Sequence, residues 1–352
     1  VQGVTTGVVE TTDTLGEILI PLGGTHGVDY NFAEARHASI RGQVHLSTPD
    51  GDCWDETIEH RPVAGATILL LDADGNQVDE STTDADGTYA FTNLKPGQYT
   101  VFEITPDHLL EGGAQAGSVD GERRGLADGS RISEIELLSG DDGVEYEFCD
   151  HEPARLSGSV YHDRDNDGVP EAGEEGIANA LLSLLDEEGS LVDSVETDED
   201  GSYEFVGLRA GNYRVIQMQP NGWLDGTDRA GTASGRPTGR ALNPGDEIEA
   251  ISLLWGDDAR DYDFGELKPV SLEGRVHLST PDGDCWDIDE DLLEPVAGAV
   301  VQLLDANGQI LAESVTDADG NYFFENLEPG EYRVREITPE GLIEAGAHAG
   351  EV

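Results

Sequence analysis

Short runs in which apolar and polar residues alternate follow one another along the chain, and turn-forming residues separate them. In the segment 38–152 these runs lie at 39–46, 66–71, 77–82, 88–91, 99–104, 132–138 and 144–148. The pairs between them, such as Asp74-Gly75 and Pro96-Gly97, tolerate the tight backbone of hairpin turns. Alternation with period two is typical of half-buried strands, and no stretch has a helical period of useful length. The pattern therefore predicts an all-β fold.

Seven such runs in one segment favour a Greek-key β-sandwich of the immunoglobulin-like or prealbumin-like kind over a closed barrel. Successive antiparallel strands send alternate connections to opposite ends of a sandwich. The first, third and fifth connections should therefore meet at one end. These connections are 47–62, 84–87 and 105–131 in one segment, and 163–179, 198–201 and 220–246 in the next, and they are rich in Asp. We call the end where they meet the acidic pole.

A long internal repeat sets the domain organisation. The stretch 42–55 returns almost unchanged as 274–287, 232 residues later, and a related unit starts at Gly158, halfway between the two. The first 37 residues match the stretch from 235 onward at the same offset. We therefore expect a tandem array of two alternating domain types, cut from a longer chain. The expected segments are 1–37, the last strands of a preceding type B domain; 38–152, type A; 153–269, type B; and 270–352, a type A domain that stops before its last strands.

Charge narrows the function classes. The 74 acidic residues against 19 basic ones give a formal net charge of −55, which excludes nucleic acid as a partner because phosphates would be repelled. A cation is the natural counter-charge. Hydrophobic residues make up 37% of the chain, enough for a folded protein rather than a disordered one. No apolar stretch is long enough to predict membrane insertion.

One loop has the spacing of a calcium site. In the twelve residues 163–174, carboxylates occupy positions 1, 3, 5 and 12, Gly occupies position 6, and a backbone carbonyl is available at position 7: Asp163, Asp165, Asp167, Glu174, Gly168 and Val169. Hard oxygen ligands at alternate residues suit Ca²⁺. The loop is not an EF-hand, because strands rather than helices flank it. A solvated acidic turn is the alternative interpretation.

Other acidic turns are weaker candidates for Ca²⁺. The first loop of type A has a less regular set in its two copies: Asp50, Asp52 and Asp55, and Asp282, Asp284 and Asp287. A shorter Thr-Asp-x-Asp-Gly turn recurs in each domain, with Asp84 and Asp86, Asp198 and Asp200, and Asp317 and Asp319. Hairpin chemistry alone explains these turns, but their expected place at the acidic pole makes them possible ligands.

The cysteines occur only in type A. Cys53 lies in the first loop and Cys149 at the end of the last strand, so both are expected at the acidic pole. Their joint presence in type A and joint absence from type B favour a disulfide over two buried thiols, and hence an oxidising compartment. Cys285 corresponds to Cys53, and its partner is expected beyond Val352.

Several motifs in fixed order carry a resemblance to a known family. They are Asp163-x-Asp-x-Asp-Gly, Glu175-Gly176-Ile177, Thr197-Asp198-x-Asp200-Gly201-x-Tyr203-x-Phe205 and Leu208-x-x-Gly211-x-Tyr213-x-Val215. This pattern, over essentially the whole chain, resembles the serine-aspartate-repeat adhesin B domain (SdrD B-like), which is related to collagen-adhesin B (Cna-B) domains. The resemblance implies calcium-stiffened stalks of secreted bacterial surface proteins. The isopeptide crosslink of many Cna-B domains is not expected, because Lys95 and Lys268 lie outside the first strands.

The residues bear on three function classes: an enzyme, a structural repeat and an adhesin. Repetition of the acidic turns from domain to domain favours a structural role over an enzyme, and a zinc site at His45, His162 or His277 lacks a second soft ligand at suitable spacing. We expect a structural subunit of an extracellular, calcium-stiffened fibre or cell-surface stalk, located outside the cell or on a bacterial surface. The alternative is an adhesin repeat that itself binds a matrix or host ligand. Expected partners are neighbouring copies of the repeat, covalently continuous or joined by strand exchange.

Overall fold

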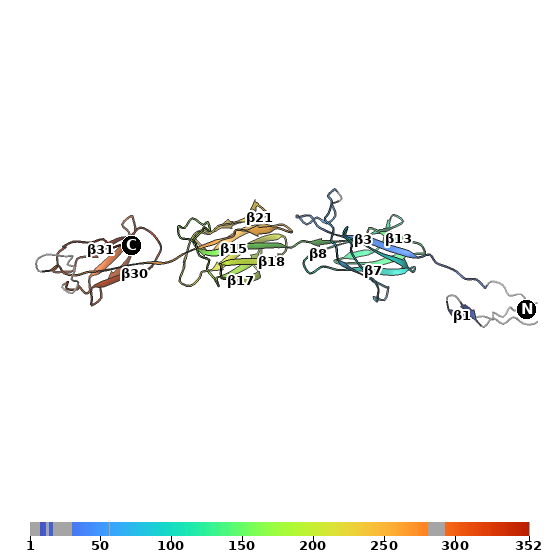
Figure 1. Ribbon diagram of the computed structural model, residues 1–352, viewed down its shortest axis with the longest axis horizontal. Helices are drawn as coiled ribbons and strands as arrows, with labels where there is room; N and C mark the ends of the chain where they lie inside the picture. Colours follow the sequence, from blue (N-terminus) through green and yellow to red (C-terminus); the bar gives the residue numbers. More distant parts are fainter. Residues whose placement is uncertain (1–7, 12–13, 17–29, 56, 281–292, 352) are drawn as a thin grey trace, which may run out of the picture. The chain divides into compact units, whose positions relative to one another are not determined.

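The computed structural model describes residues 8–11, 14–16, 30–55, 57–280 and 293–351, and in these residues every regular element is a β-strand. The all-β prediction is therefore confirmed. By its internal contacts the chain divides into two compact units, Val1–Glu152 and Pro153–Val352, and several of their strands are labelled in Figure 1. Among the described residues no helix is long and apolar enough to cross a membrane.

The first unit contains a sandwich of two sheets, here called sandwich A (38–152). Its strands are β3 (Ala38–Leu46), β4 (Thr67–Leu71), β5 (Gln77–Thr82), β6 (Thr88–Leu94), β7 (Gly97–Ile104), β8 (Leu110–Gln115), β9 (Ser118–Val119), β10 (Glu122–Arg123), β11 (Leu126–Asp128), β12 (Arg131–Leu137), β13 (Asp142–Val144) and β14 (Glu147–His151). One sheet has the order β10-β9-β13-β3-β14-β8, with β6 also paired to β3, and the other has the order β11-β12-β7-β4-β5. The first strand and the last strand, β3 and β14, run parallel.

The second unit begins with a sandwich of the same plan, here called sandwich B (153–269). Its strands are β15 (Ala154–His162), β16 (Leu181–Asp186), β17 (Leu191–Glu196), β18 (Ser202–Leu208), β19 (Gly211–Met218), β20 (Leu224–Asp225), β21 (Thr232–Ala233), β22 (Arg236–Pro237), β23 (Arg240–Ala241), β24 (Glu247–Leu253), β25 (Asp258–Arg260) and β26 (Phe264–Leu267). Its sheets have the orders β20-β26-β15-β25-β21-β22, with β18 also paired to β15, and β17-β16-β19-β24-β23. Here too the first and last strands, β15 and β26, are parallel.

The remaining strands form smaller sheets. They are β1 (Val8–Thr11), β2 (Thr14–Gly16), β27 (Val270–Arg275), β28 (Val300–Leu304), β29 (Ile310–Val315), β30 (Asn321–Leu327) and β31 (Arg333–Ile337). Strand β27 pairs with β30, and β29-β28-β31 forms a three-stranded sheet over Val301, Leu303 and Phe324. The pairing of Leu272 with Phe324 repeats that of Ile40 with Phe91 in sandwich A. The boundaries of the four expected segments stay predictions.

The long connection 105–131 differs from the prediction. It was expected to be a loop, but it contains β8, β9, β10 and β11, and β8 pairs with β14 over Glu147 to His151. The last expected strand is also displaced: it is split into β13 and β14 around Glu145, whose φ is 62°. A left-handed residue interrupts a strand because its backbone leaves the extended region. The last strand therefore continues through Cys149 to His151.

Buried tyrosine hydroxyls connect the strands of each core. Tyr89 of β6 donates to the carbonyl of Tyr146 at 2.7 Å, and Tyr203 of β18 donates to the carbonyl of Tyr262 at the same distance. Each carbonyl lies over a first-strand glycine, Gly42 or Gly158, at which a Cβ atom would approach the carbonyl oxygen to 1.7 Å. Only glycine can occupy these two positions without displacing the backbone.

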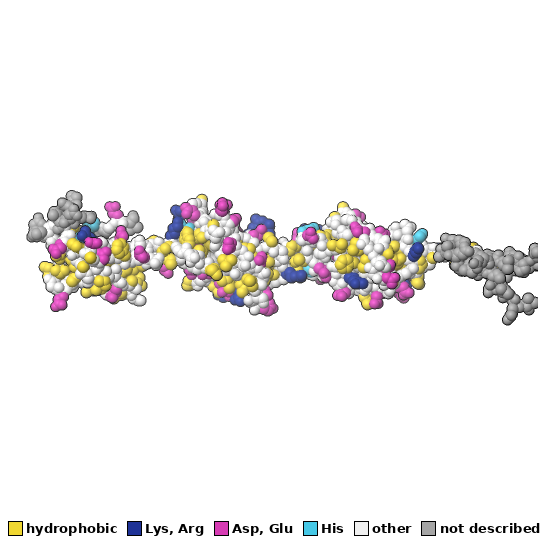
Figure 2. Space-filling view, turned by 90° about the horizontal axis from the view of Figure 1, so that it is seen from below, with side chains coloured by type: hydrophobic (Ala, Val, Ile, Leu, Met, Phe, Trp, Pro, Cys, Tyr) yellow, Lys and Arg dark blue, Asp and Glu magenta, His cyan; other side chains and the backbone are white. Residues whose placement is uncertain are grey.

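A buried threonine fixes the first loop in each domain. The hydroxyl of Thr83 donates to the carbonyl of Val63 at 2.7 Å and accepts the N–H of Ala66 at 2.9 Å. Thr197 in sandwich B and Thr316 in the segment 293–351 make the same two bonds, with donor–acceptor distances between 2.6 and 2.9 Å. The end of the first loop is therefore held to the start of the Asp-Gly hairpin, as expected for connections at one pole. Acidic side chains are spread widely over the surface (Figure 2).

Candidate metal centre

The candidate loop starts where β15 leaves the sheet. Asp163, directly after β15, donates its N–H to the carbonyl of Glu266 at 2.9 Å, and its side chain is 0% exposed. Its carboxylate accepts the N–H of Asp167 at 3.2 Å and that of Gly168 at 2.8 Å. Gly168 has φ = 76°, and a Cβ atom there would come within 2.8 Å of Thr227. The first and sixth positions of the loop are thus set by the fold itself.

Three carboxylates of this loop converge. Asp163, Asp165 and Glu174 each offer an oxygen, and these oxygens lie within 4.8 Å of one another. The two oxygens of Glu174 accept the N–H groups of Arg164 at 2.8 Å and Glu171 at 3.0 Å, which orients the carboxylate toward the loop. Burial raises the pKa of Asp163, and the charge of Glu174 raises it further. A bound cation would relieve this repulsion.

The other predicted ligands of the loop lie outside this group. The Asp167 carboxylate accepts the N–H of Val169 at 2.8 Å, which closes a local turn. Val169 itself is exposed. The structure therefore brings together Asp163, Asp165 and Glu174, at positions 1, 3 and 12 of the loop. Asp167 and Val169, at positions 5 and 7, do not belong to this group.

The carboxylates of the first aspartates in the Asp-Gly hairpins accept hydrogen bonds from backbone N–H groups of their own turns. Asp198 accepts the N–H groups of Asp200 and Ser202, both at 2.9 Å. Asp84 binds the N–H groups of Asp86 and Thr88 in the same way, and Asp317 binds those of Asp319 and Asn321. These hydrogen bonds lower the pKa of Asp84 and of Asp317. Such turns are complete without an ion, and the structure does not bring their carboxylates into the group formed by Asp163, Asp165 and Glu174.

The first loop of sandwich A has no comparable convergence among its described residues. Asp50 accepts the hydroxyl of Thr48 at 2.5 Å, and Asp52 accepts the N–H of Trp54 at 2.8 Å. Asp55 accepts both the N–H and the hydroxyl of Thr57, which lowers its pKa. Each aspartate thus serves a separate turn. The equivalent residues Asp282, Asp284 and Asp287, together with Cys285, lie outside the described residues.

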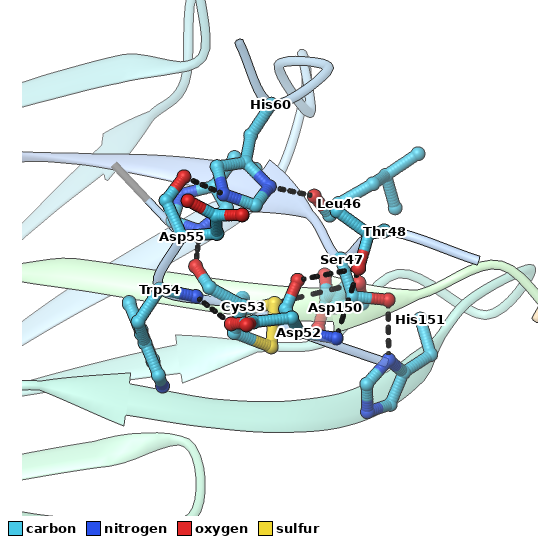
Figure 3. The surroundings of a disulfide bond; sticks show 12 residues. Leu46, Ser47, Thr48, Asp52, Cys53, Trp54, Asp55, His60, Asp150 and His151 are labelled. Carbon is cyan, nitrogen blue, oxygen red and sulfur yellow. Dashed lines mark hydrogen bonds between the residues drawn. A yellow bond between two sulfur atoms is a disulfide. The ribbon is translucent and has the colours of Figure 1, made fainter. Parts of the chain in front are cut away.

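A disulfide occupies the acidic pole of sandwich A (Figure 3). Cys53 and Cys149 are bonded, as predicted, with their Cα atoms 5.8 Å apart and a sequence separation of 96. Both cysteines are buried. Beside them the N–H of Ser47 donates to the carbonyl of Asp150, and the Ser47 hydroxyl shares a hydrogen bond with His151 Nδ1. The first loop is therefore covalently attached to β14.

A pair of buried acids behind this disulfide was not predicted as a site. Glu103 of β7 is 1% exposed and Asp150 of β14 is 0% exposed. Burial, followed by the neighbouring Asp150 charge, raises the pKa of Glu103 to about 9, and burial raises that of Asp150 to about 7. Two adjacent carboxyls in a core are stable only if they retain a proton between them. Because 47 residues separate them, no local motif could have shown the pair.

The chain is similar to several known proteins. The family model described as "SdrD B-like domain" matches residues 46–145, 154–269 and 279–351. The serine-aspartate repeat-containing protein D of Staphylococcus aureus (strain Newman) is 30% identical over 306 residues, which cover 84% of this chain and 22% of the relative. The serine-aspartate repeat-containing protein F of Staphylococcus epidermidis (strain ATCC 12228 / FDA PCI 1200) is 28% identical, with coverage of 83% and 18%. The chain thus spans about a fifth of the length of these relatives.

Two solved structures are similar to parts of the chain at low identity. BcpA, the major pilin subunit of Bacillus cereus, is 13% identical with a TM-score of 0.38, and the match covers 86% of this chain and 88% of the pilin. The Bacillus anthracis TIE protein is 18% identical with a TM-score of 0.36, and the match covers 90% of this chain and 48% of that protein. The family match extends over most of the chain. The chain belongs to the SdrD B-like domain family and is a β-sandwich repeat of an extracellular or cell-surface protein.

Proposed function

We propose that this chain is part of a stalk or fibre outside the cell, that bound Ca²⁺ stiffens its tandem sandwiches, and that its role is structural rather than catalytic. The observation that carries the proposal is the convergence of Asp163, Asp165 and Glu174 on one point of the loop that follows β15. Calcium is favoured over softer metals because every available ligand is a hard oxygen.

The residues of the loop fit such an ion. Asp163 is buried and held by two backbone N–H groups, so its position is fixed before any ion arrives. Asp165 and Glu174 approach it from the two arms of the loop, and binding would join these arms. The ion itself supplies positive charge among three carboxylates. The energetic gain is the removal of their repulsion, which stabilises the connection between β15 and β16.

Short links between domains support a stiff stalk. Only Glu152 and Pro153 separate β14 from β15, and only Lys268 and Pro269 separate β26 from β27. Proline fixes its own φ angle and restricts the residue before it. Links of this length and composition are far from the flexible Gly/Ser regime. A structural role is also supported by the hairpin carboxylates, which are engaged in backbone hydrogen bonds of their own turns.

A calcium titration of the complete chain tests the proposal. After removal of metal by a chelator, we expect isothermal calorimetry with CaCl₂ to detect binding. Asp165→Asn and Glu174→Gln should each weaken the loop site by at least about tenfold, because each removes a charged ligand. Glu188→Gln, an exposed acid in the turn between β16 and β17, is the matched control for loss of one negative charge.

Two results would contradict the proposal. One is the absence of calcium binding by the unaltered chain. The other is equal binding by Asp165→Asn, Glu174→Gln and the Glu188→Gln control. Small-angle scattering on the same samples provides a second readout, because a calcium-stiffened chain should have a larger maximum dimension with calcium than with chelator.

A further inference from the structure

The link that follows sandwich B begins with Lys268, and the chain has only one other lysine, Lys95. Lys268 stands directly after β26 and directly before Pro269. Its Nζ lies 3.8 Å from Glu175 Oε2 and 5.2 Å from the centroid of the Trp223 ring. The first residue of the link therefore contacts two parts of the sandwich that are distant from it in the sequence.

Trp223 gives Lys268 a support of fixed position. Its N–H donates to the carbonyl of Pro220 at 3.3 Å, and its ring packs against the core of sandwich B. The ring also meets that of His162, the last residue of β15, with the two centroids 5.1 Å apart. A cation over the face of an indole is attracted by the charge distribution of the ring. The indole thus offers the link lysine a surface that the core itself positions.

Glu175 connects the link to the candidate metal loop. Its Oε1 lies 3.4 Å from a guanidinium nitrogen of Arg164, while its Oε2 faces Lys268. Its carbonyl accepts the N–H of His162 at 2.8 Å. Glu175 directly follows Glu174, whose Oε1 accepts the N–H of Arg164 at 2.8 Å. The two arms of the loop that an ion would join therefore contain both the carboxylate that contacts Lys268 and the second partner of that carboxylate.

Sandwich A makes the same contact with opposite charges. Glu152 takes the place of Lys268, since each stands before the proline of its link. Arg61 takes the place of Glu175, since its carbonyl likewise accepts the N–H of the last residue of the first strand. Arg61 and Glu152 form an ion pair. Both charges are reversed and the pair is kept, so the two sandwiches share the contact between first loop and link rather than the sign of either group.

Neither contact of Lys268 is strong by itself. The Lys268 and Glu175 side chains are 54% and 66% exposed, and an exposed ion pair shifts an equilibrium by about fivefold at most. A cation over an exposed aromatic ring adds a similar factor. Contacts of this strength form or break with small changes in the order of their partners. They suit an element that responds to its surroundings rather than a permanent lock.

We propose that Glu175, Lys268 and Trp223 form a clamp on the link after sandwich B, and that an ion in the loop 163–174 closes it. The bound ion fixes Glu174 and with it the next residue, Glu175, whose carboxylate then holds the link lysine against the indole. The inference rests on the calcium binding proposed above, and it assigns the route by which the ion acts on the link outside its own loop. In sandwich A the disulfide attaches the first loop permanently, so the corresponding pair needs no ion.

Labelling the complete chain with ¹⁵N-lysine tests the clamp, because it gives only two backbone amide signals. One comes from Lys268, and the other comes from Lys95 in the turn between β6 and β7. With saturating CaCl₂ we expect an order parameter of about 0.85 for the Lys268 amide, and with chelator a fall below about 0.6. Glu175→Gln and Trp223→Leu should give the lower value even with calcium. Lys95 is the internal control, and Glu188→Gln is the matched control for the loss of one negative charge.

A charge reversal tests the pair without removing it. Glu175→Lys/Lys268→Glu copies the polarity of sandwich A. In CaCl₂ we expect small-angle scattering to give this double variant the maximum dimension of the unaltered chain. Lys268→Glu alone places two acids against each other, so its maximum dimension should be smaller. Equal dimensions for the single and double variants would contradict the clamp.

The outcomes separate the clamp from the function on which it rests. If the Lys268 amide is equally ordered in the unaltered chain, in Glu175→Gln and in Trp223→Leu, the clamp is wrong, whatever calorimetry shows of calcium binding. If Glu175→Gln lowers the order but chelator does not, the ion does not close the clamp and the inference is wrong. If the unaltered chain binds no calcium, the proposed function is wrong as well. Hydrogen exchange in β19 verifies that Trp223→Leu folds; if it does not, the exposed Glu175→Gln decides alone.

Discussion

Sandwiches A and B have the same strand order but attach their first loops differently. Where Ser47 follows the first strand in sandwich A, Asp163 follows it in sandwich B, and each donates its N–H to the last strand. Where β14 carries Cys149, bonded to Cys53, β26 carries Gly265. A Cβ atom at Gly265 would lie 3.1 Å from the Asp163 carboxylate, so the small residue leaves room for that side chain. A covalent bond in one domain thus corresponds to a carboxylate cluster in the other.

The comparison shows that two parts of the fold vary independently. One is the shared frame of strands and buried hydrogen bonds, and the other is the attachment of the first loop to the last strand. Both sandwiches keep the buried tyrosine hydroxyl, the first-strand glycine and the loop threonine with nearly identical distances. These neutral hydrogen bonds need neither metal nor oxidation. The acidic pole therefore carries a disulfide in one sandwich and a carboxylate cluster in the other, while the strands around it stay in register.

Removal of the disulfide should have the largest effect, and it should be confined to sandwich A. Closing a loop of 96 residues contributes about 4 kcal/mol by restricting the unfolded chain. In the Cys53→Ser/Cys149→Ser variant of the complete chain, we expect hydrogen exchange to accelerate in β3 and β7 but not in β15 and β19. Chelation of calcium should give the opposite pattern.

One outcome of this test would contradict the assignment of a separate loop attachment to each sandwich. Equal acceleration in both sandwiches on loss of the disulfide would show that the two domains unfold together. In that case the two attachments could not be assigned to separate domains. The unaltered chain treated with a mild reductant is the control for effects of the serine substitutions.

Replacing the loop threonine should have a smaller effect that is the same in both domains. In Thr83→Val and Thr197→Val, the isosteric side chain leaves a buried N–H and a buried carbonyl without their partner. We expect each variant to lose about 2 kcal/mol of stability in its own sandwich, measured by hydrogen exchange. Thr83→Ser and Thr197→Ser keep the hydroxyl and serve as controls. A loss of stability in only one of the two sandwiches would show that the threonine hydrogen bonds do not stabilise both domains equally.

The smallest expected effect is a pH dependence of sandwich A. The folded-state pKa values of Glu103 and Asp150, about 9 and about 7, lie above the ordinary values of 4.5 and 3.8. Folding therefore retains protons that the unfolded chain releases, so the stabilising contribution is complete at low pH and is lost as pH rises through these folded values. We expect the stability of sandwich A to fall by about 1 kcal/mol per pH unit near neutrality. Hydrogen exchange in β7 measures the slope, which should be smaller in Glu103→Gln. An unchanged slope in that variant would assign the pH dependence to other groups.

Much of the fold could be predicted because its main strands alternate clearly. Runs such as Thr88 to Phe91 and Ser202 to Phe205 show both the alternation and the turn residues that precede them. The short strands β8 to β11 could not be predicted, because their pairing depends on the distant strand β14 and their sequence is rich in Gly. The displacement of the last strand arises from the left-handed Glu145, which no sequence rule indicates.

For the candidate site, local spacing was informative and long-range assembly was not. Asp163, Asp165 and Glu174 belong to one loop, so their spacing alone indicated a common point. Asp198 and Asp200 were placed at the right pole by strand parity, but the sequence could not show that backbone N–H groups engage the Asp198 carboxylate. Glu103 and Asp150 were missed because they are 47 positions apart in the sequence, and only the folded sheets bring them together.

The parallel pairing of the first and last strands has a mechanical consequence. In sandwich B, Val160, Tyr161 and His162 pair with Phe264, Gly265 and Glu266. Tension along the chain pulls β15 backward and β26 forward, so it loads this ladder in shear. All of its hydrogen bonds must then yield together rather than open one after another. The proposed ion adjoins this ladder through Asp163, whose N–H donates to the carbonyl of Glu266, so calcium should raise the force at which the domain ruptures.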